Sequence, residues 1–469
     1  MEQTRYFLGR AAAVICCMGL LCLALAACSS DDNPVVVNPS EPDSPTEEPV
    51  DTARYTIIVY GNAGGYADLA IEQVFEQMKP LLKLGDDVRL IFAYKYGMDN
   101  DTHDYFTGKY ADPGMVVYFE MHDGLDLNSI RENSGVYPDF PMFDTSQLTY
   151  MLNDVARNAP ARDYIFVVWG HGSGYNPMFD VPWNLKLSAN TEAAATTRGV
   201  IHDEWLHQDA MDMYEFSRAI EDSDIGRFKA IFFHNCMLGN MESLTEIQPC
   251  AEYLMSSSHL LYSGGQPVVN LVKHLREGNF EEAARKLFTD DYEEWKSAYP
   301  DGLNGDMNMV RAERLTDVNA QIRRLANWLC RNYPTQKEAI DRATDRVYRF
   351  VQDNYDDFYD VADYADKLSE ETGDADVKEI SQSLRAAFDR AFVHRIKTDS
   401  PAKTSLPEYT LSTVIVHKNI YLYEQPLQGA DYSYGLIYSG TAYHQLTGWG
   451  NWLSMNERMP EGNPYGQPE

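Results

Sequence analysis

The sequence is short of positive charge. Its 39 Lys and Arg residues stand against 71 Asp and Glu residues, which leaves a formal net charge of −32. This balance excludes nucleic acid as a partner, because the protein would repel the phosphate backbone. The same charge favours solubility and attracts cationic partners such as basic peptides, without identifying one.

The sequence also has few cysteines and no ordered cysteine pattern. No CxxC pair and no zinc-like spacing occurs among the seven cysteines. Only three of them, Cys236, Cys250 and Cys330, lie beyond residue 28. An odd and widely spaced set predicts no disulfide framework, so at least one thiol stays unpaired within the chain. Cys250 and Cys330 fall in or beside helix-like segments and are expected to be core residues.

Motifs of two other hydrolase classes are missing. An esterase elbow around Ser173 would need glycines two residues before and after it, but these positions hold His171 and Tyr175. The histidines at 171, 202, 207 and 234 show no HExxH spacing, so no metal ligand is predicted among them. A metal-dependent hydrolase remains only a weak alternative.

Long hydrophobic runs are absent except near the N-terminus. The apolar run at 11–27 follows Arg5 and Arg10 and is too short for a comfortable membrane span, as in a signal peptide. It ends in Leu25-Ala26-Ala27-Cys28, which resembles the lipobox of bacterial lipoproteins. The resemblance implies that Cys28 is lipidated and begins the mature chain. An ordinary secretory signal with a chance cysteine is the alternative.

The residues after Cys28 predict a tether. Prolines and acidic residues alternate through 28–53, a composition typical of an extended, self-repelling chain. We therefore expect a lipid anchor in the cell envelope, with the folded body held off a membrane surface. The acidic pair Asp31-Asp32 resembles surface-export signals, which favours the outer membrane and exposure at its surface. The sequence does not determine which side of that membrane carries the protein.

Apolar runs and helix-period segments alternate from residue 54 to about 267, which predicts a catalytic domain with an open, mostly parallel sheet and helices on both faces. The runs are expected to be buried parallel strands and lie at 55–61, 88–96, 115–121, 164–170, 228–236 and, less clearly, 252–258. The helical segments lie at 68–84, 145–158, 212–222 and 240–250. Asp144-Thr145-Ser146 is a credible N-cap cluster. From 268 to 469 the pattern predicts a mainly helical C-terminal subdomain, which closes with β-like stretches at 409–418, 432–439 and 447–453.

Two residues that can carry chemistry follow apolar runs. His171 stands between Gly170 and Gly172 after one strand, and Cys236 follows another. Parallel strands present their sites at their carboxyl ends, so both side chains are expected at one edge of the sheet. A thiolate attacks carbonyl groups, and an imidazole serves as base and then as acid. A buried core thiol and a turn histidine are the alternatives.

The flanking residues suggest how this pair would work. Glycines beside His171 let a substrate backbone approach, and they leave the Gly172 amide free to meet an oxyanion. A helix predicted near Asn240 would lower the pKa of Cys236 through its positive end.

These two segments resemble the clostripain-like cysteine peptidases of the caspase, gingipain and legumain group. The resemblance lies in "YIFVVWGHG" and in "AIFFHNCMLGN" followed by a Glu-bearing helix, and more weakly in "YTIIVYGNA", "GVIHDEWLHQDAMDMYEFSRAI" and "YSYGLIYSGTAYHQLTGWGNWL". It covers roughly 54–455. It implies a caspase-like fold and peptide hydrolysis through an acyl-enzyme. It also implies catalytic His171 and Cys236, and an oxyanion hole from the amides of Gly172 and Cys236.

The sequence departs from the family pattern in two places. The family commonly reads Asp-Ala-Cys where this chain has His234-Asn235-Cys236, and a protonated His234 would favour the thiolate. In the family, an acidic residue in the segment that matches 255–268 recognises Arg or Lys before the scissile bond. This chain has no acidic residue in 255–268, so the sequence does not determine which residue is preferred there. The departures keep a second hypothesis in view: a peptide-binding lipoprotein that has the fold but little turnover.

Self-processing and calcium are further expectations. Relatives are often cleaved in the loop after the histidine, and the irregular stretch 176–201 offers Lys186 and Arg198. No cofactor is required for the dyad. Calcium stimulates some relatives, and acidic clusters at 99–101 and 290–294 are candidate sites, although solvated acidic faces are the commoner explanation.

Overall fold

The computed structural model describes the chain from residue 52 to 456 with gaps. The described ranges are 52–62, 66–97, 109–112, 114–136, 142, 144–170, 172, 199–202, 210–261, 264–298, 305–350, 358–398, 405–415, 438 and 440–456. Residues 52–469 form one compact unit, separate from the unit 1–51. Among the described residues, no helix has the length and apolarity needed to span a membrane.

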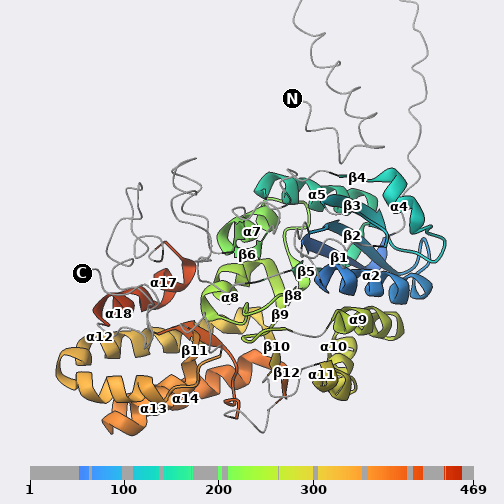
Figure 1. The fold of residues 1–469 in the computed structure, drawn as a ribbon. Coiled ribbons are helices and arrows are strands. Elements are labelled where there is room, and N and C mark those ends of the chain that lie inside the picture. The colour runs from blue at the N-terminus through green and yellow to red at the C-terminus, as the bar shows by residue number, and fades with distance from the viewer. Residues whose placement is uncertain are drawn as a thin grey trace, which may run out of the picture. The chain divides into compact units, whose positions relative to one another are not determined.

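Nine strands of the described residues form one sheet in this unit (Figure 1). Its strand order is β12-β10-β9-β8-β5-β1-β2-β3-β4. The five central strands pair in parallel, and the outer strands on both sides pair antiparallel. The bounds are β1 (Ala53–Asn62), β2 (Val88–Lys95), β3 (Met115–Glu120), β4 (Gly135–Val136), β5 (Ala161–Gly170), β8 (Phe228–His234), β9 (Ala251–Ser256), β10 (Gly305–Arg311) and β12 (Phe392–Thr398).

Helices and two small strand pairs accompany the sheet (Figure 1). The helices are α2 (Tyr66–Met78), α4 (Asn128–Asn133), α5 (Thr145–Asn158), α7 (Met213–Glu221), α8 (Met241–Ile247), α9 (Gln266–Glu277), α10 (Phe280–Thr289), α11 (Tyr292–Ala298), α12 (Leu315–Arg346), α13 (Val361–Thr372), α14 (Ala375–Ala391), α17 (Ala442–Thr447) and α18 (Trp449–Met455). Single 3₁₀ turns are η2 (Lys79–Leu81), η4 (Gln248–Cys250) and η5 (Ala312–Arg314). Two small pairs, β6 (Gly199–His202) with β7 (Ala210–Asp212) and β11 (Phe358–Asp360) with β13 (Ser412–Val414), complete the list.

Each face of the sheet has its own apolar core, because neighbouring strand residues point to opposite faces. Ile58 packs with α5, α7 and α8 in one core, and Ile57 packs with α2, α9 and α10 in the other. Burial on both faces explains why the central runs are continuously apolar. The predicted α/β fold with helices on both faces is therefore confirmed.

Local signals fixed the helix boundaries well. Helix α5 spans the predicted 145–158, and the Asp144 side chain accepts a hydrogen bond from the Gln147 amide as its N-cap. Asn240 caps α8 in the same way, with the Ser243 amide as donor. Such caps satisfy amides that have no partner within the helix.

Two expectations from sequence were wrong. The run 115–121 was predicted as a buried parallel strand, but β3 pairs antiparallel with β2 and is only partly buried. The stretch 447–453 was predicted as β-like, yet it belongs to α17 and α18. Its tryptophans are buried against helix α12 and β13 rather than in a sheet, and the Trp449 indole donates to the Val414 oxygen at 2.6 Å.

The residues beyond 268 also complete the main sheet. Strands β10 and β12 extend it past β9, although they lie within the predicted C-terminal subdomain. Helices α12, α13 and α14 join the same apolar core as α8. The change near residue 268 to a mainly helical sequence pattern therefore does not mark the end of the sheet.

Candidate active site

Strands β5 and β8 are neighbours and end at the same edge of the sheet. They pair in parallel, with Trp169 opposite His234. β5 ends at Gly170 and β8 at His234, so the two predicted motifs continue from adjacent strand ends. His171 itself lies outside the described residues. The strand ends that precede the two motifs therefore lie at the same edge of the sheet, as the site hypothesis requires.

Gly172 lies against the backbone of Cys236. A Cβ atom built on Gly172 would stand 2.4 Å from the Cys236 carbonyl oxygen and 3.3 Å from its amide nitrogen. The same atom would stand 2.9 Å from Cβ of Asn235. No real side chain fits such spacing, so glycine at this position is a steric requirement of close backbone approach. The residue after His171 and the predicted nucleophile are thus in van der Waals contact.

A sharp turn follows Cys236. Met237 adopts a left-handed φ of 59°, which is uncommon for a residue with a side chain and costs on the order of 1 kcal/mol. The surroundings hold it there: its amide donates to the His259 oxygen at 3.0 Å, and the Gly239 amide donates to the Ser257 oxygen at 2.7 Å. The segment after β9 therefore fixes the backbone next to the thiol.

Cys236 is a free cysteine that is partly exposed as a residue, but its thiol has a raised pKa. Helix α8 begins at Met241, close to the prediction. Burial raises the pKa of Cys236, which is the opposite direction to the lowering expected from that helix. The Leu261 amide donates to Sγ at 3.4 Å and opposes the burial in part. In this structure the thiol is protonated at neutral pH.

His234 lies two positions before Cys236 in the sequence. Its side chain is buried and is not a cation. Its ring stacks on Trp169 with centroids 4.2 Å apart and meets Phe232 edge-on. Burial lowers the pKa of His234 to about 4. His234 is therefore neutral at neutral pH, so the condition under which it was expected to favour the thiolate is not met. Asn235 is also buried and forms the surface that Gly172 contacts.

The residues that surround the turn after Cys236 were not predicted from the sequence. Leu261 and the run Ser256-Ser257-Ser258-His259 were noted only for lacking an acid. The signal was available, because these residues follow β9 directly, and β9 is the parallel neighbour of β8. Asp306, on β10, gave no signal of its own. All of them meet at the carboxyl edge of the central strands.

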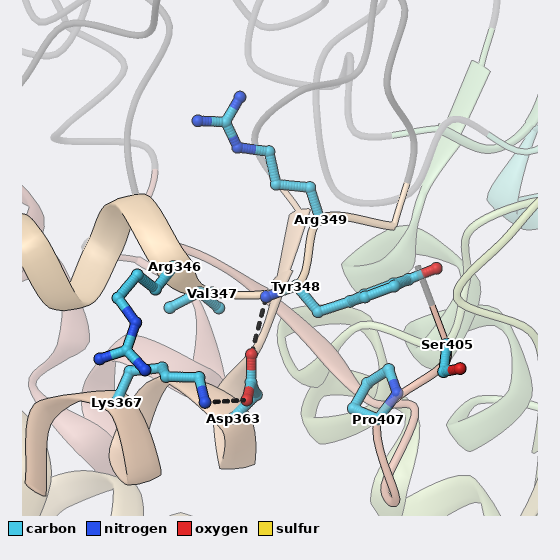
Figure 2. A pocket seen from close by; sticks show the side chains of 8 residues that line it. All are labelled: Arg346, Val347, Tyr348, Arg349, Asp363, Lys367, Ser405 and Pro407. Atoms are coloured by element: carbon cyan, nitrogen blue, oxygen red, sulfur yellow. Dashed lines mark hydrogen bonds and ion pairs between the residues drawn. The ribbon is translucent and has the colours of Figure 1, made fainter. Parts of the chain in front are cut away.

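A cavity of about 530 Å³ lies elsewhere and is lined by Arg346, Val347, Tyr348, Arg349, Asp363, Lys367, Ser405 and Pro407 (Figure 2). None of the predicted site residues that the structure describes is among its lining residues. Two of its cations are already paired, Arg346 with Glu370 and Glu371 and Lys367 with Asp363 and Glu370. Its link to the site is Tyr348, whose hydroxyl lies 3.1 Å from Nε2 of His259. Figure 2 shows the Tyr348 ring extending toward Ser405, away from Arg349.

The remaining predicted sites are the possible metal and calcium sites and the lipidation and self-cleavage residues. Within the described parts of the chain, no three His, Cys, Asp or Glu residues gather in a way that could hold a metal ion. In the acidic cluster 290–294, Asp291 pairs with His274, Glu294 accepts from Asn270, and Asp290 lies 3.6 Å from Arg285. The lipidation residue Cys28, the self-cleavage candidates Lys186 and Arg198, and the acidic cluster 99–101 lie outside the described residues.

The other two thiols differ from Cys236. Cys250 is fully buried, its sulfur donates to the Ser217 oxygen at 3.5 Å, and burial raises the pKa of Cys250 to about 12. Cys330 is partly buried on α12 and packs against the core. Their expected role as core residues is confirmed.

Comparison with solved structures finds the same fold. A secreted C11 cysteine protease from Bacteroides thetaiotaomicron, titled "iotapain", superposes with a TM-score of 0.56 at 15% identity, over 85% of this chain and 99% of that one. A secreted C11 cysteine protease from Bacteroides thetaiotaomicron in complex with an irreversible peptide inhibitor gives a TM-score of 0.56 at 14% identity, over 85% of this chain and 100% of that one. An inactive zymogen C11 protease from Parabacteroides distasonis gives 0.54 at 17%, over 85% and 99%.

The family comparison covers most of the described chain. Comparison with curated protein sequences finds no match. The model of the clostripain family, in contrast, matches residues 120–442. This range includes the strand end before His171, the Cys236 turn and the segment that follows β9. The chain therefore belongs to the clostripain family of cysteine peptidases.

Proposed function

We propose that this chain cleaves peptide bonds with Cys236 as nucleophile and His171 as general base and then general acid. The observation that carries the proposal is the contact of Gly172 with the Cys236 backbone, which joins the two motifs at one sheet edge. A free cysteine at that edge, partly exposed as a residue, supplies the nucleophile. Membership of a cysteine peptidase family supports the same chemistry.

The chemistry follows from these groups. The imidazole removes the thiol proton while Sγ attacks the peptide carbonyl carbon, and the carbonyl oxygen becomes an oxyanion near the Gly172 and Cys236 amides. The tetrahedral intermediate collapses, the C–N bond breaks, and the imidazolium protonates the leaving amine. Water then attacks the thioester, loses its proton to His171, and releases the acid and the thiol.

The raised pKa of Cys236 adds one condition. Since the resting thiol is protonated at neutral pH, attack requires a base at the moment of reaction rather than a stored thiolate. His234 does not supply this base by sequence proximity, because it is stacked on Trp169. His171 is the residue in the right motif for the role.

The substrate is expected to be a peptide or protein without a strict need for Arg or Lys before the scissile bond. The position two residues before Cys236 carries the neutral His234, and no acidic residue occurs in 255–268. An uncharged or small residue is the favoured alternative. Cleavage sites mapped by mass spectrometry across a defined peptide mixture test this preference, and strict cleavage after Arg or Lys contradicts it.

Anchoring and processing belong to the same proposal. A lipid on Cys28 and the tether 28–53 would hold the peptidase at the outer membrane, exposed to peptide substrates. Cleavage within 176–201 at Lys186 or Arg198 would open the chain beside the His171 motif. Calcium is not required by the dyad chemistry.

The decisive experiment uses the purified mature chain and a quenched fluorescent peptide library. Cys236→Ala and His171→Ala should each abolish hydrolysis, whereas Cys330→Ala, which removes another partly exposed thiol, should leave it intact. Hydrolysis that survives Cys236→Ala refutes the proposal. Peptide binding without turnover in the unchanged protein would favour the alternative of a binding lipoprotein.

A further inference from the structure

Asp306 is a buried carboxylate that organises the segment beside the nucleophile. It lies on β10, is 1% exposed, and accepts hydrogen bonds from two backbone amides of that segment, Ser258 at 3.2 Å and His259 at 3.1 Å. The Ser257 hydroxyl donates to it at 3.0 Å. The Asn308 side chain adds a fourth donor at 2.8 Å. A buried carboxylate is stable only with such partners, so the segment and Asp306 fix each other.

His259 provides the fifth contact of Asp306. Its Nδ1 lies 2.7 Å from Oδ1 of the carboxylate, and its Nε2 lies 3.1 Å from the Tyr348 hydroxyl. One ring nitrogen is thus hydrogen-bonded to the carboxylate and the other to the tyrosine hydroxyl. The ring is thereby held at both ends, and only 6% of its side chain is exposed.

The ordered segment holds the turn after Cys236. The His259 oxygen accepts the Met237 amide at 3.0 Å, and the Ser257 oxygen accepts the Gly239 amide at 2.7 Å. The Leu261 amide donates to Sγ of Cys236 at 3.4 Å. These bonds maintain the left-handed conformation of Met237, which an unsupported chain would leave.

We propose that Asp306 and His259 are positioning residues for the Cys236 nucleophile. They do not touch the reacting atoms; they fix the Ser257–His259 segment, and this segment fixes the backbone on which Sγ is carried. The inference rests on the proposed role of Cys236. Misplacement of a reacting group by about 1 Å costs a reaction on the order of 10²-fold in rate, so loss of either residue should reduce turnover.

The chain contains a matched control. His274 and Asp291 form a second His–Asp pair, with Nε2 and Oδ2 2.9 Å apart and side chains 9% and 15% exposed. His274 lies near the end of α9, where Arg54 at the start of β1 contacts the Leu275 and Gly278 oxygens. This is the amino edge of the sheet, opposite Cys236. Substitutions there disturb a similar pair without approaching the site.

The test compares His259→Leu, His259→Asn and Asp306→Asn with His274→Leu and Asp291→Asn in the mature chain. Turnover of a fluorogenic peptide and the rate of Cys236 alkylation by iodoacetamide are measured, with kcat expressed per titrated thiol and melting temperature recorded separately. We expect His259→Leu and Asp306→Asn to lower kcat by roughly 10- to 100-fold with KM changed less than about threefold. The control variants should lose thermal stability but keep kcat.

The conservative variant separates positioning from general stability. In His259→Asn the side-chain amide can still donate to Asp306, so kcat should recover to within a few-fold of the unchanged protein. If Asp306→Asn fails to fold, the two His259 variants decide the matter. Unchanged kcat and alkylation in His259→Leu, an equal loss in His259→Asn, or an equal loss of kcat in the controls overturns the proposal. Hydrolysis that survives Cys236→Ala instead overturns the proposed function.

Discussion

The backbone of Gly172 lies so close to Cys236 that a methyl group on the glycine would stand 2.4 Å from the cysteine carbonyl oxygen. This contact joins two motifs that are 64 residues apart in sequence, since 236 − 172 = 64. It follows from the parallel pairing of β5 with β8.

Gly172→Ala should therefore inactivate the peptidase. The added methyl group must push the two backbones apart and displace both proposed oxyanion donors, with an expected loss of kcat on the order of 10²- to 10³-fold. Steady-state kinetics with a fluorogenic peptide measure it. Gly124→Ala is the control, because its Cβ would meet only the movable His122 ring at 3.3 Å. Full activity in Gly172→Ala would show that the close approach is not used in catalysis.

The three thiols of the body should react at different rates. Cys250 is fully buried with its pKa raised to about 12, so it should stay unmodified in the native protein. Cys236 is partly exposed and is the proposed nucleophile, so it should be alkylated first. Peptide mapping after brief exposure to iodoacetamide measures the order. Faster labelling of Cys330 than of Cys236 would argue against an activated thiol at 236.

His234 should make the fold sensitive to acid. Its folded pKa of about 4 lies below the ordinary value of 6.5, so the folded state takes up this proton later than the unfolded state. The stability from neutral His234 is present above about pH 6.5 and is lost as pH falls toward 4, by on the order of 3 kcal/mol. Urea unfolding from pH 4 to 8 should show this loss. His234→Phe keeps the stack on Trp169 and should flatten the curve; an unchanged slope contradicts the assignment.

Glu242 should have the opposite pH dependence. This carboxyl is buried in α8, and burial raises its pKa, although Oε1 accepts from Thr413, Val414 and Tyr438 at 2.8, 3.1 and 2.9 Å. With a raised folded pKa, its contribution to stability is complete below the ordinary carboxyl pKa and is lost as pH rises through the folded value. Glu242→Gln keeps the acceptor without the charge and should gain stability over the unchanged protein toward alkaline pH. Glu242→Ala should lower the free energy of unfolding by about 1–3 kcal/mol, because three buried donors lose their acceptor.

Self-processing should depend on Cys236. Intact-mass analysis of the purified chain is expected to show cleavage at Lys186 or Arg198, and Cys236→Ala should remain a single chain. The double variant Lys186→Ala, Arg198→Ala should stay intact while still reacting with iodoacetamide at Cys236. Identical intact chains in the unchanged protein and in Cys236→Ala would end this hypothesis.

The sequence was most informative where the cause of structure is local. Helix α5 was predicted to the residue, because Asp144 caps it through a side chain three positions from the amide it binds. The central strands were found because burial on both faces requires unbroken apolar runs. β3 was misassigned as parallel, since an apolar run does not reveal the direction of its partner.

For the site, the sequence by itself determined which residue types stand at the strand ends and which family they resemble. Whether those strands are neighbours, how the pKa values shift and which distant groups support the turn were decided by tertiary structure. Burial raised the pKa of Cys236, although its position near a helix start had suggested a lowered pKa, and burial also lowered the pKa of His234 to about 4. Asp306 carries no local signal, because a carboxylate becomes a positioning group only when folding brings five donors to it and removes water.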